Sequence, residues 1–341
     1  MTLRRGAACL GTTAAAAATT LSWCRKDEEF GGEILKHPAL AHGFPQTNYV
    51  AASESFVACF DFRTRNPAWV VEHLTNASVR LDEAKRETRF REFEGIPERM
   101  RSRLSDYAGS GFDRGHLAPA ANHKHSQDAM RDTFSLLNIS PQVGVGFNRD
   151  YWARVEKFVR DVAKKGVADK VTVVTGPLFL GSAQQTIGTP PSLVHVPTHF
   201  FKIVLAETTP RAVWSGGGYA VAAFVVPNKP IQPDTPLTDF LAPLEAVEAA
   251  AGMVLFGRLL TPDRRAKLRA DEAKYFLHKS KTTKAAQMLL LPDGGGSPPP
   301  APDTSKLPTD ITHLCDRHKC DLVAAKWLDQ FKQQDDEGGG D

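Results

Sequence analysis

The chain has 341 residues, of which 42% are hydrophobic and 24% are charged, and its formal net charge is +3. These proportions are ordinary for a soluble globular protein, and they exclude a disordered chain, a collagen and a polytopic membrane protein. The length fits two domains or one large domain with appendages. Five cysteines are too few for a disulfide scaffold, and a charge this close to zero does not predict a polyanionic partner.

The first 30 residues differ in composition from the rest of the chain. Arg4, Arg5, Arg25 and Lys26 lie among many alanines and threonines, and no acidic residue precedes position 27. This pattern predicts a mitochondrial targeting presequence. A membrane anchor or a secretory signal stays open as an alternative, because residues 6–24 are nearly long enough to span a bilayer although they are only weakly apolar.

Four apolar runs predict buried strands, and they occupy residues 55–62, 171–175, 200–205 and 219–226. Residues 148–165 predict an amphipathic helix with Asn148 as its N-cap. The apolar residues on one face of this helix are Trp152, Val155, Val159 and Val162. Strands and helices without a βαβ rhythm predict an α+β fold rather than a doubly wound sheet.

A basic cluster precedes the most informative part of the chain, and its members are Lys85, Arg86, Arg89, Arg91, Arg99, Arg101 and Arg103. Four glutamates are interleaved with these residues, so we favour a solvated surface of mixed charge. One edge of a nucleic-acid groove is the alternative interpretation.

The side chains best suited to chemistry lie between residues 110 and 156. Within DRGHLAPAA (113–121), His116 can act as a neutral general base, and Arg114 offers a planar set of donors suited to phosphate. Oxygen-bearing side chains follow at Asn138, Gln142, Asn148 and Glu156. Such ligands suit Mg²⁺, which keeps several waters and takes one or two protein ligands. Asn148 and Glu156 are eight residues apart, so one can contact a metal directly and the other through its water.

From these residues alone, a structural histidine is the more frequent case. However, residues 113–158 (DRGHLAPAANHKHSQDAMRDTFSLLNISPQVGVGFNRDYWARVEKF) resemble the core of the DNA/RNA non-specific endonucleases, a ββα-metal nuclease family. The DRGH signature, the NISPQ segment and an N-x-x-x-W-x-x-x-E helix occur in order and at the family's spacing. Flanking pieces agree, namely GFPQT, RTRNPAWVVEHL, GPLFL and VPTHFFKIVL, so the resemblance covers about residues 40–260.

The resemblance implies a ββα-metal (His-Me finger) core with a central, mostly antiparallel sheet flanked by helices. His116 matches the family's general base, which activates the attacking water. Asn148 matches the direct protein ligand of Mg²⁺, and Glu156 matches the carboxylate that holds metal-bound water. Arg114 and Arg65 match arginines that contact phosphate and stabilise charge in the transition state.

Three further residues are expected to form the substrate-binding part of the site. Asn138 matches a polar residue that lines the site near His116, and Asp113 is expected to fix the local strand or loop geometry. Arg149 departs from the family, because relatives often carry a neutral amide there, and it adds a cation beside the metal. The GVG segment at 144–146 also looks more flexible than usual.

The function implied by the resemblance is a Mg²⁺-dependent, sugar-non-specific endonuclease that hydrolyses phosphodiester bonds of DNA and RNA and leaves 5′-phosphates, with Mn²⁺ as a substitute ion. Contacts to phosphate and sugar alone imply no sequence specificity. The resemblance also implies a homodimer in the mitochondrial intermembrane space or at the inner membrane, with a role in mitochondrial nucleic-acid turnover or in DNA degradation during cell death. The alternatives are a 5′–3′ exonuclease of the same fold, a non-catalytic nucleic-acid-binding module and a zinc-dependent interaction protein.

The resemblance places the nuclease domain at residues 31–290. Residues 291–308 are rich in proline and glycine and predict a flexible linker or insertion. Residues 309–334 resume a folded pattern with a helix at 322–332. Paired cysteines follow the core in some relatives, which implies that this helical segment packs on the nuclease domain. The acidic, glycine-rich residues 335–341 predict a disordered tail.

The remaining histidines and cysteines give weaker signals. His123 and His125 suggest a polar surface turn, with a metal site as the alternative. The segment HLCDRHKC (313–320) permits a zinc site, a disulfide or free thiols. The usual CxxC spacing is absent, which counts against zinc. We favour free thiols, with a disulfide as the alternative. Cys59 lies in a predicted strand and is expected to be a small core residue.

Overall fold

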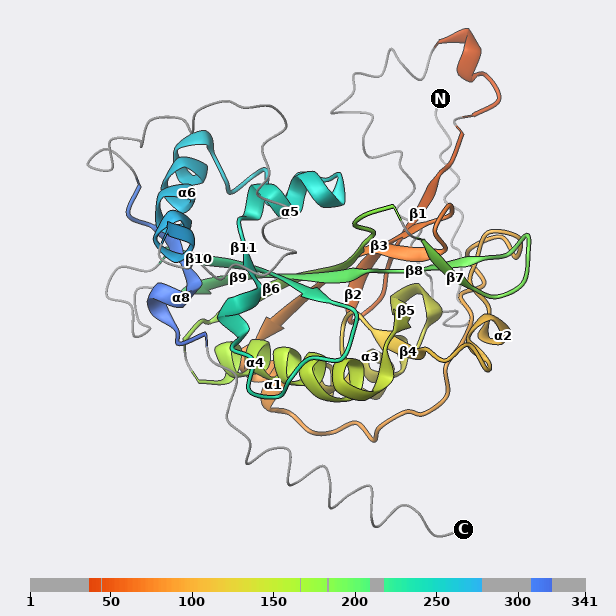
Figure 1. Cartoon of the computed structure of the whole chain (residues 1–341), viewed down its shortest axis with the longest axis horizontal. Coiled ribbons are helices and arrows are strands. Elements are labelled where there is room, and N and C mark those ends of the chain that lie inside the picture. Colours follow the sequence, from red (N-terminus) through yellow and green to blue (C-terminus); the bar gives the residue numbers. More distant parts are fainter. Residues whose placement is uncertain are drawn as a thin grey trace, which may run out of the picture.

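The structure is a computed structural model that describes residues 37–43, 45–165, 167–182, 184–208, 218–277 and 308–320 (Figure 1). The predicted presequence or anchor, the tail and the helix at 322–332 lie outside the described residues, and so does nearly all of the predicted linker. Among the described residues, no helix is long and apolar enough to cross a membrane.

An eight-stranded sheet forms the centre of the described part of the chain. Its strands, in spatial order, are β1 (Asn48–Ala52), β2 (Phe56–Asp61), β3 (Asn66–Thr75), β6 (Lys170–Leu178), β9 (His199–Thr208), β10 (Gly218–Pro227) and β11 (Leu241–Ala242), with β12 (Ile311–His313) paired to β10. All neighbouring strands are antiparallel except β10 and β12, which run parallel. The four predicted strands and the mostly antiparallel α+β fold are therefore confirmed.

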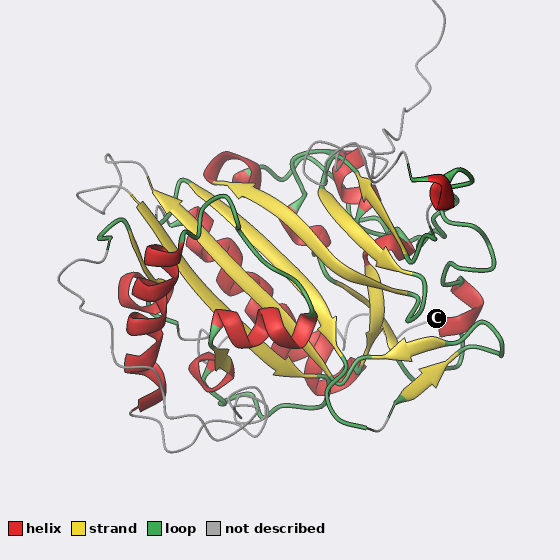
Figure 2. Ribbon diagram, turned by 90° about the horizontal axis from the view of Figure 1, so that it is seen from above, coloured by secondary structure: helices red, strands yellow, loops and turns green. Residues whose placement is uncertain are grey.

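Helices cover both faces of this sheet, as Figures 1 and 2 show. α4 (Ala153–Lys164) and α1 (Asn76–Arg80) lie on one face, and α5 (Leu244–Ala251) and α6 (Pro262–Leu277) lie on the other. Alternate strand residues join two different cores: Val173 and Val204 pack with α4, whereas Val174 and Ile203 pack with α5 and α6. Because both faces are buried, the central strands β6, β9 and β10 are mostly apolar instead of alternating with polar residues.

Short elements connect the sheet to a small hairpin beside α4. The hairpin consists of β4 (Asp113–His116) and β5 (Ile139–Gln142). The other short elements are η3 (Pro38–Leu40), α2 (Leu104–Tyr107), η4 (Ala120–Asn122), α3 (Gln127–Asp132), η5 (Leu136–Asn138), the β7–β8 hairpin (Gln185–Ile187, Val194–Val196), η7 (Leu237–Phe240) and α8 (Leu314–Arg317).

The entry to α4 differs from the prediction of one helix that starts at Asn148. A wide π-helical segment, η6 (Gly144–Trp152), precedes α4, and its backbone leaves helical geometry at Val145 and Gly146. The backbone N–H of Asn148 already donates to the carbonyl of Val143 at 2.9 Å, so Asn148 lies inside this segment and is not the N-cap. Gly146 permits the break because its φ of 81° is open to glycine.

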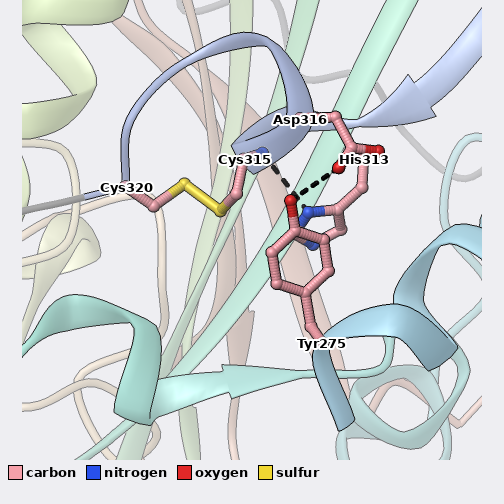
Figure 3. Close-up of a disulfide and its surroundings, with 5 residues drawn as sticks. All are labelled: Tyr275, His313, Cys315, Asp316 and Cys320. Atoms are coloured by element: carbon pink, nitrogen blue, oxygen red, sulfur yellow. Dashed lines mark hydrogen bonds between the residues drawn. A yellow bond between two sulfur atoms is a disulfide. The ribbon is translucent and has the colours of Figure 1, made fainter. Parts of the chain in front are cut away.

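The C-terminal segment contains a disulfide between Cys315 and Cys320, which corrects our preference for free thiols (Figure 3). The one-turn helix α8 and the residues after it bring the two cysteines together, and Cys320 is buried in the core. Because both sulfurs are bonded to each other, the zinc interpretation is also wrong for this state of the segment. Tyr275 of α6 donates to Asp316 at 2.6 Å and fastens the segment to the domain. Cys59 is a free, buried core residue, as predicted.

Candidate active site

The β4–β5 hairpin brings two parts of the predicted motif into register. Asp113 pairs with Gln142, and Gly115 pairs with Ser140. A Cβ atom on residue 115 would lie 2.0 Å from Oε1 of Gln142, so this position of the DRGH motif requires glycine. The hairpin can therefore close tightly and carry the neighbouring side chains of β4 to fixed places.

His116 stands at the end of β4 among aromatic rings. Its imidazole packs edge-on against Phe134 at 4.8 Å between ring centroids and lies 5.5 Å from Phe90. Within the described part of the chain, its buried Nε2 atom has no hydrogen-bond partner. Burial, helped by the positive charge of Arg86, lowers the pKa of His116 to about 3. The ring is therefore neutral near pH 7, which is the form that accepts a proton.

Asp113 holds the side chains of Asn148 and Arg149 together. Its Oδ2 accepts a hydrogen bond from Nδ2 of Asn148 at 2.9 Å and another from Nε of Arg149 at 2.8 Å, and its Oδ1 accepts from Arg149 at 2.7 Å. Burial opposes ionisation of Asp113, but these hydrogen bonds hold its pKa below the usual value. Because the amide nitrogen of Asn148 is committed to Asp113, the amide oxygen Oδ1 is the atom left to bind a ligand.

Glu156 lies on α4, eight residues after Asn148. Burial raises its pKa to about 7, although the positive charges of Lys202 and Arg160 work in the opposite direction. A divalent cation would favour the ionised carboxylate, and the two oxygen donors of Asn148 and Glu156 suit a hard cation such as Mg²⁺. Among the described residues, no group of three or more His, Cys, Asp or Glu could hold a metal.

Arg114 of β4 and Arg86 of the preceding loop lie near the aromatic rings that surround His116. Arg114 stacks over the ring of Phe90 at 4.6 Å, and Arg86 lies 6.0 Å from the ring of Phe134. Arg86 belongs to the basic cluster and was not predicted as a site residue. Its position in a cluster just before the motif was the one sequence feature that could have indicated a role in the site. Other cluster members form ion pairs with the interleaved glutamates, such as Arg101 with Glu92 at 3.2 Å, as a mixed-charge surface predicts.

Asn138 and Arg65 make structural contacts in the described part of the chain. Asn138 is fully buried, and its amide bonds to both backbone polar groups of Ala118 and to the carbonyl of Thr133. It therefore fixes the turn that follows His116. The guanidinium of Arg65 is buried and donates to the carbonyls of residues 99 and 101. These contacts indicate that both residues support the surrounding loops. The substrate contacts expected for Asn138 and Arg65 stay predictions.

A group of buried charges lies on the α4 side of the sheet and was not predicted from the sequence. Glu72 of β3 and Lys202 of β9 are each at most 2% exposed, and their charges interact with each other and with Glu156 and Arg160 of α4. His123 belongs to this group: it is 1% exposed and lies 3.0 Å from Glu72. The favoured surface turn at His123 is therefore wrong, because a buried carboxylate binds this side chain.

Comparisons with known proteins identify the family of the chain. The model of the DNA/RNA non-specific endonuclease family matches residues 36–261. The mitochondrial nuclease of Saccharomyces cerevisiae is 46% identical over 230 residues, covering 64% of this chain and 69% of its own length. Human mitochondrial endonuclease G is 40% identical over 238 residues, covering 67% of this chain and 75% of its own length.

A solved structure extends the agreement to three dimensions. A chain from the crystal structure of an EndoG/EndoGI complex is similar with a TM-score of 0.59 and 37% identity, covering 66% of this chain and 92% of that chain. The residues matched by the family model contain the whole motif segment 113–158. The chain therefore belongs to the DNA/RNA non-specific endonuclease family.

Proposed function

We propose that this endonuclease hydrolyses phosphodiester bonds with His116 as general base and with one Mg²⁺, or Mn²⁺ in its place, held directly by Asn148 and through water by Glu156. The observation that carries the proposal is the half-buried, neutral imidazole of His116, whose buried Nε2 atom has no protein partner among the described residues. A polar atom left unpaired in a buried site costs stability, so it is expected to have a partner during function. An attacking water is the partner that fits.

The side chains act in a simple order. His116 takes a proton from the attacking water, and burial keeps the ring neutral and ready. Arg114 and Arg86 bind the phosphate and neutralise the charge that develops on it. Asp113 keeps the oxygen of Asn148 available for the cation. When bound, the cation would supply Lewis-acid stabilisation of the phosphate and of the leaving oxygen. The oxygen of the attacking water bonds to phosphorus and the bond from phosphorus to the 3′ oxygen breaks. The 3′ oxygen takes up a proton from solvent, and the product carries a 5′-phosphate.

The proposed substrate range and cellular setting rest on the site and on the relatives. All of the proposed contacts go to phosphate, so both DNA and RNA are substrates and no base sequence is read. Several similar proteins are named mitochondrial nucleases, so we place this enzyme in mitochondria. We further propose a homodimer in the intermembrane space or at the inner membrane that acts in nucleic-acid turnover or in DNA degradation during cell death.

The test is cleavage of supercoiled plasmid by the purified protein in Mg²⁺ and in EDTA. We expect nicking and linearisation in Mg²⁺, no cutting in EDTA, and a loss of at least about a hundredfold in His116→Ala, the scale of a lost general base. His73→Ala, an exposed histidine on β3, is the matched control and should cut normally. A circular plasmid also separates endonuclease from exonuclease, which needs a free end. An intact plasmid in Mg²⁺, or wild-type cutting by His116→Ala, would overturn the proposal.

A further inference from the structure

A continuous line of buried polar contacts links the central sheet to Arg160 of α4. The carboxylate oxygen Oε2 of Glu72 lies 3.0 Å from Nε2 of His123 and accepts a hydrogen bond from Nδ2 of Asn122 at 2.8 Å. The other end of the Asn122 amide, Oδ1, accepts from Arg160 at 3.1 Å. We call Glu72, Asn122 and His123 the positioning chain.

Burial makes this line rigid. Glu72, Asn122 and His123 are each at most 2% exposed, so water cannot replace their partners freely. Glu72 is further fixed by its strand, because β3 pairs with β2 and β6 on its two sides. A buried carboxylate that accepts two hydrogen bonds holds both donors in one orientation. The amide of Asn122 therefore has a single favourable direction, with its oxygen toward Arg160.

Arg160 is the end of the line nearest to Glu156, a residue of the candidate site. It lies one helical turn after Glu156 on α4, so the two side chains share one face. The charge of Arg160 lowers the pKa of Glu156, and in turn Glu156, after burial, is the strongest influence on the pKa of Arg160. Without Asn122, a long and flexible guanidinium beside Glu156 would be free to pair with that carboxylate in several geometries.

We propose that Glu72, Asn122 and His123 are positioning residues for the cleavage reaction: they hold the Arg160 guanidinium beside Glu156 in the geometry that stabilises the transition state. The inference rests on the proposed function of the site. None of the three residues needs to touch the substrate, because they act through Arg160. The two histidines of the NHKH segment thus differ in role, since His123 and not His125 anchors on Glu72.

The principal test is the steady-state kinetics of Asn122→Ala on a DNA substrate. Loss of a direct transition-state donor costs about 100- to 1000-fold in kcat. Here the arginine stays and only its orientation relaxes, so we expect kcat to fall about tenfold while KM changes by less than about threefold. The matched control is Asn76→Ala, which removes amide hydrogen bonds to the carbonyls of residues 163 and 164 at the far end of α4. It should shift Tm by a similar few degrees and keep its kcat.

Two further variants separate positioning from a general loss of packing. His123→Gln keeps a donor within reach of Glu72 and should retain kcat, whereas His123→Ala should lose it. Arg160→Lys keeps the charge but not the planar donors, so adding Asn122→Ala to it should cause little additional loss. This pair keeps the proposal testable if Asn122→Ala fails to fold.

The outcomes distinguish the proposal from the function on which it rests. If wild-type protein cuts no plasmid, the proposed function fails. If the wild type cuts and Asn122→Ala keeps its kcat, or if the losses in Asn122→Ala and Arg160→Lys simply multiply, the positioning chain is refuted while the nuclease function stands. A kcat loss in Asn76→Ala equal to that in Asn122→Ala would also refute it, because the effect would then reflect helix stability.

Discussion

Replacement of Asp113 by asparagine should weaken cation binding by the endonuclease more than it weakens the fold. Asp113 uses both carboxylate oxygens, one for Asn148 and Arg149 and the other for Arg149 alone. The Arg149 side chain is 64% exposed, so its ion pair adds at most about 1 kcal/mol. The main effect of the substitution is therefore that the amide of Asn148 loses its charged acceptor and is held less firmly in its orientation. A hydrogen bond to a charged group contributes about 1.5–3 kcal/mol.

That energy corresponds to about a 10- to 100-fold rise in the Mg²⁺ concentration for half-maximal plasmid cutting. The assay is a Mg²⁺ titration of the initial rate, performed at high ionic strength because the lost negative charge would otherwise weaken cation binding by itself. Arg149→Ala keeps the bond between Asp113 and Asn148, so its half-maximal concentration should stay within about threefold of wild type. If Asp113→Asn titrates like the wild-type enzyme, Asp113 does not orient the metal ligand, and the reasoning is wrong.

Three further predictions concern stability. Gly115→Ala should cost about 1–3 kcal/mol, because the added methyl group would meet Gln142 at 2.0 Å; an unchanged urea midpoint would contradict this close approach. Burial raises the pKa of Glu272 from 4.5 to about 8. As the pH rises from 4.5 to about 8, ionisation of this carboxyl group is favoured more in the unfolded chain than in the folded one. The fold therefore loses stability across this range, and the loss is complete above about pH 8. Glu272→Gln should therefore gain stability relative to wild type from pH 5 to pH 8, and a constant difference in urea unfolding would argue against this. Cys320→Ser removes the disulfide to Cys315, five positions away, and should lower the free energy of unfolding by about 2 kcal/mol. Dithiothreitol should lower the Tm of the wild-type protein to the Tm of this variant. A wild-type Tm that does not change in dithiothreitol would contradict a stabilising disulfide.

Local sequence patterns were sufficient to predict much of the secondary structure. The runs at 171–175 and 219–226 are β6 and β10 because apolar, β-branched residues favour strands wherever both faces are buried. The entry to α4 was predicted less well. The periodic apolar residues from Trp152 onward indicated the helix, but the π-helical turn before it depends on Gly146 and on the contact of Asn148 with Asp113, 35 residues earlier.

The cysteines and histidines show the limit of sequence reasoning more sharply. The spacing of Cys315 and Cys320 left three chemical states open, because a pairing depends on how the backbone turns between them. The structure closes that turn at α8 and gives the disulfide. His123 looked like a surface residue because polar neighbours surround it in the sequence. Its burial is decided by Glu72, a residue 51 positions away that is buried in the sheet.

The sequence by itself was sufficient to predict the family and the candidate catalytic residues, which the net charge of +3 did not indicate. His116, Asn148 and Glu156 occur at a spacing that is visible without coordinates, because β4, η6 and α4 follow one another within 52 residues. Only the tertiary structure decided how these side chains are held. Asp113, Gly115 and the positioning chain act through contacts between strands, loops and helices, and such contacts depend on the packing of segments that are distant in sequence.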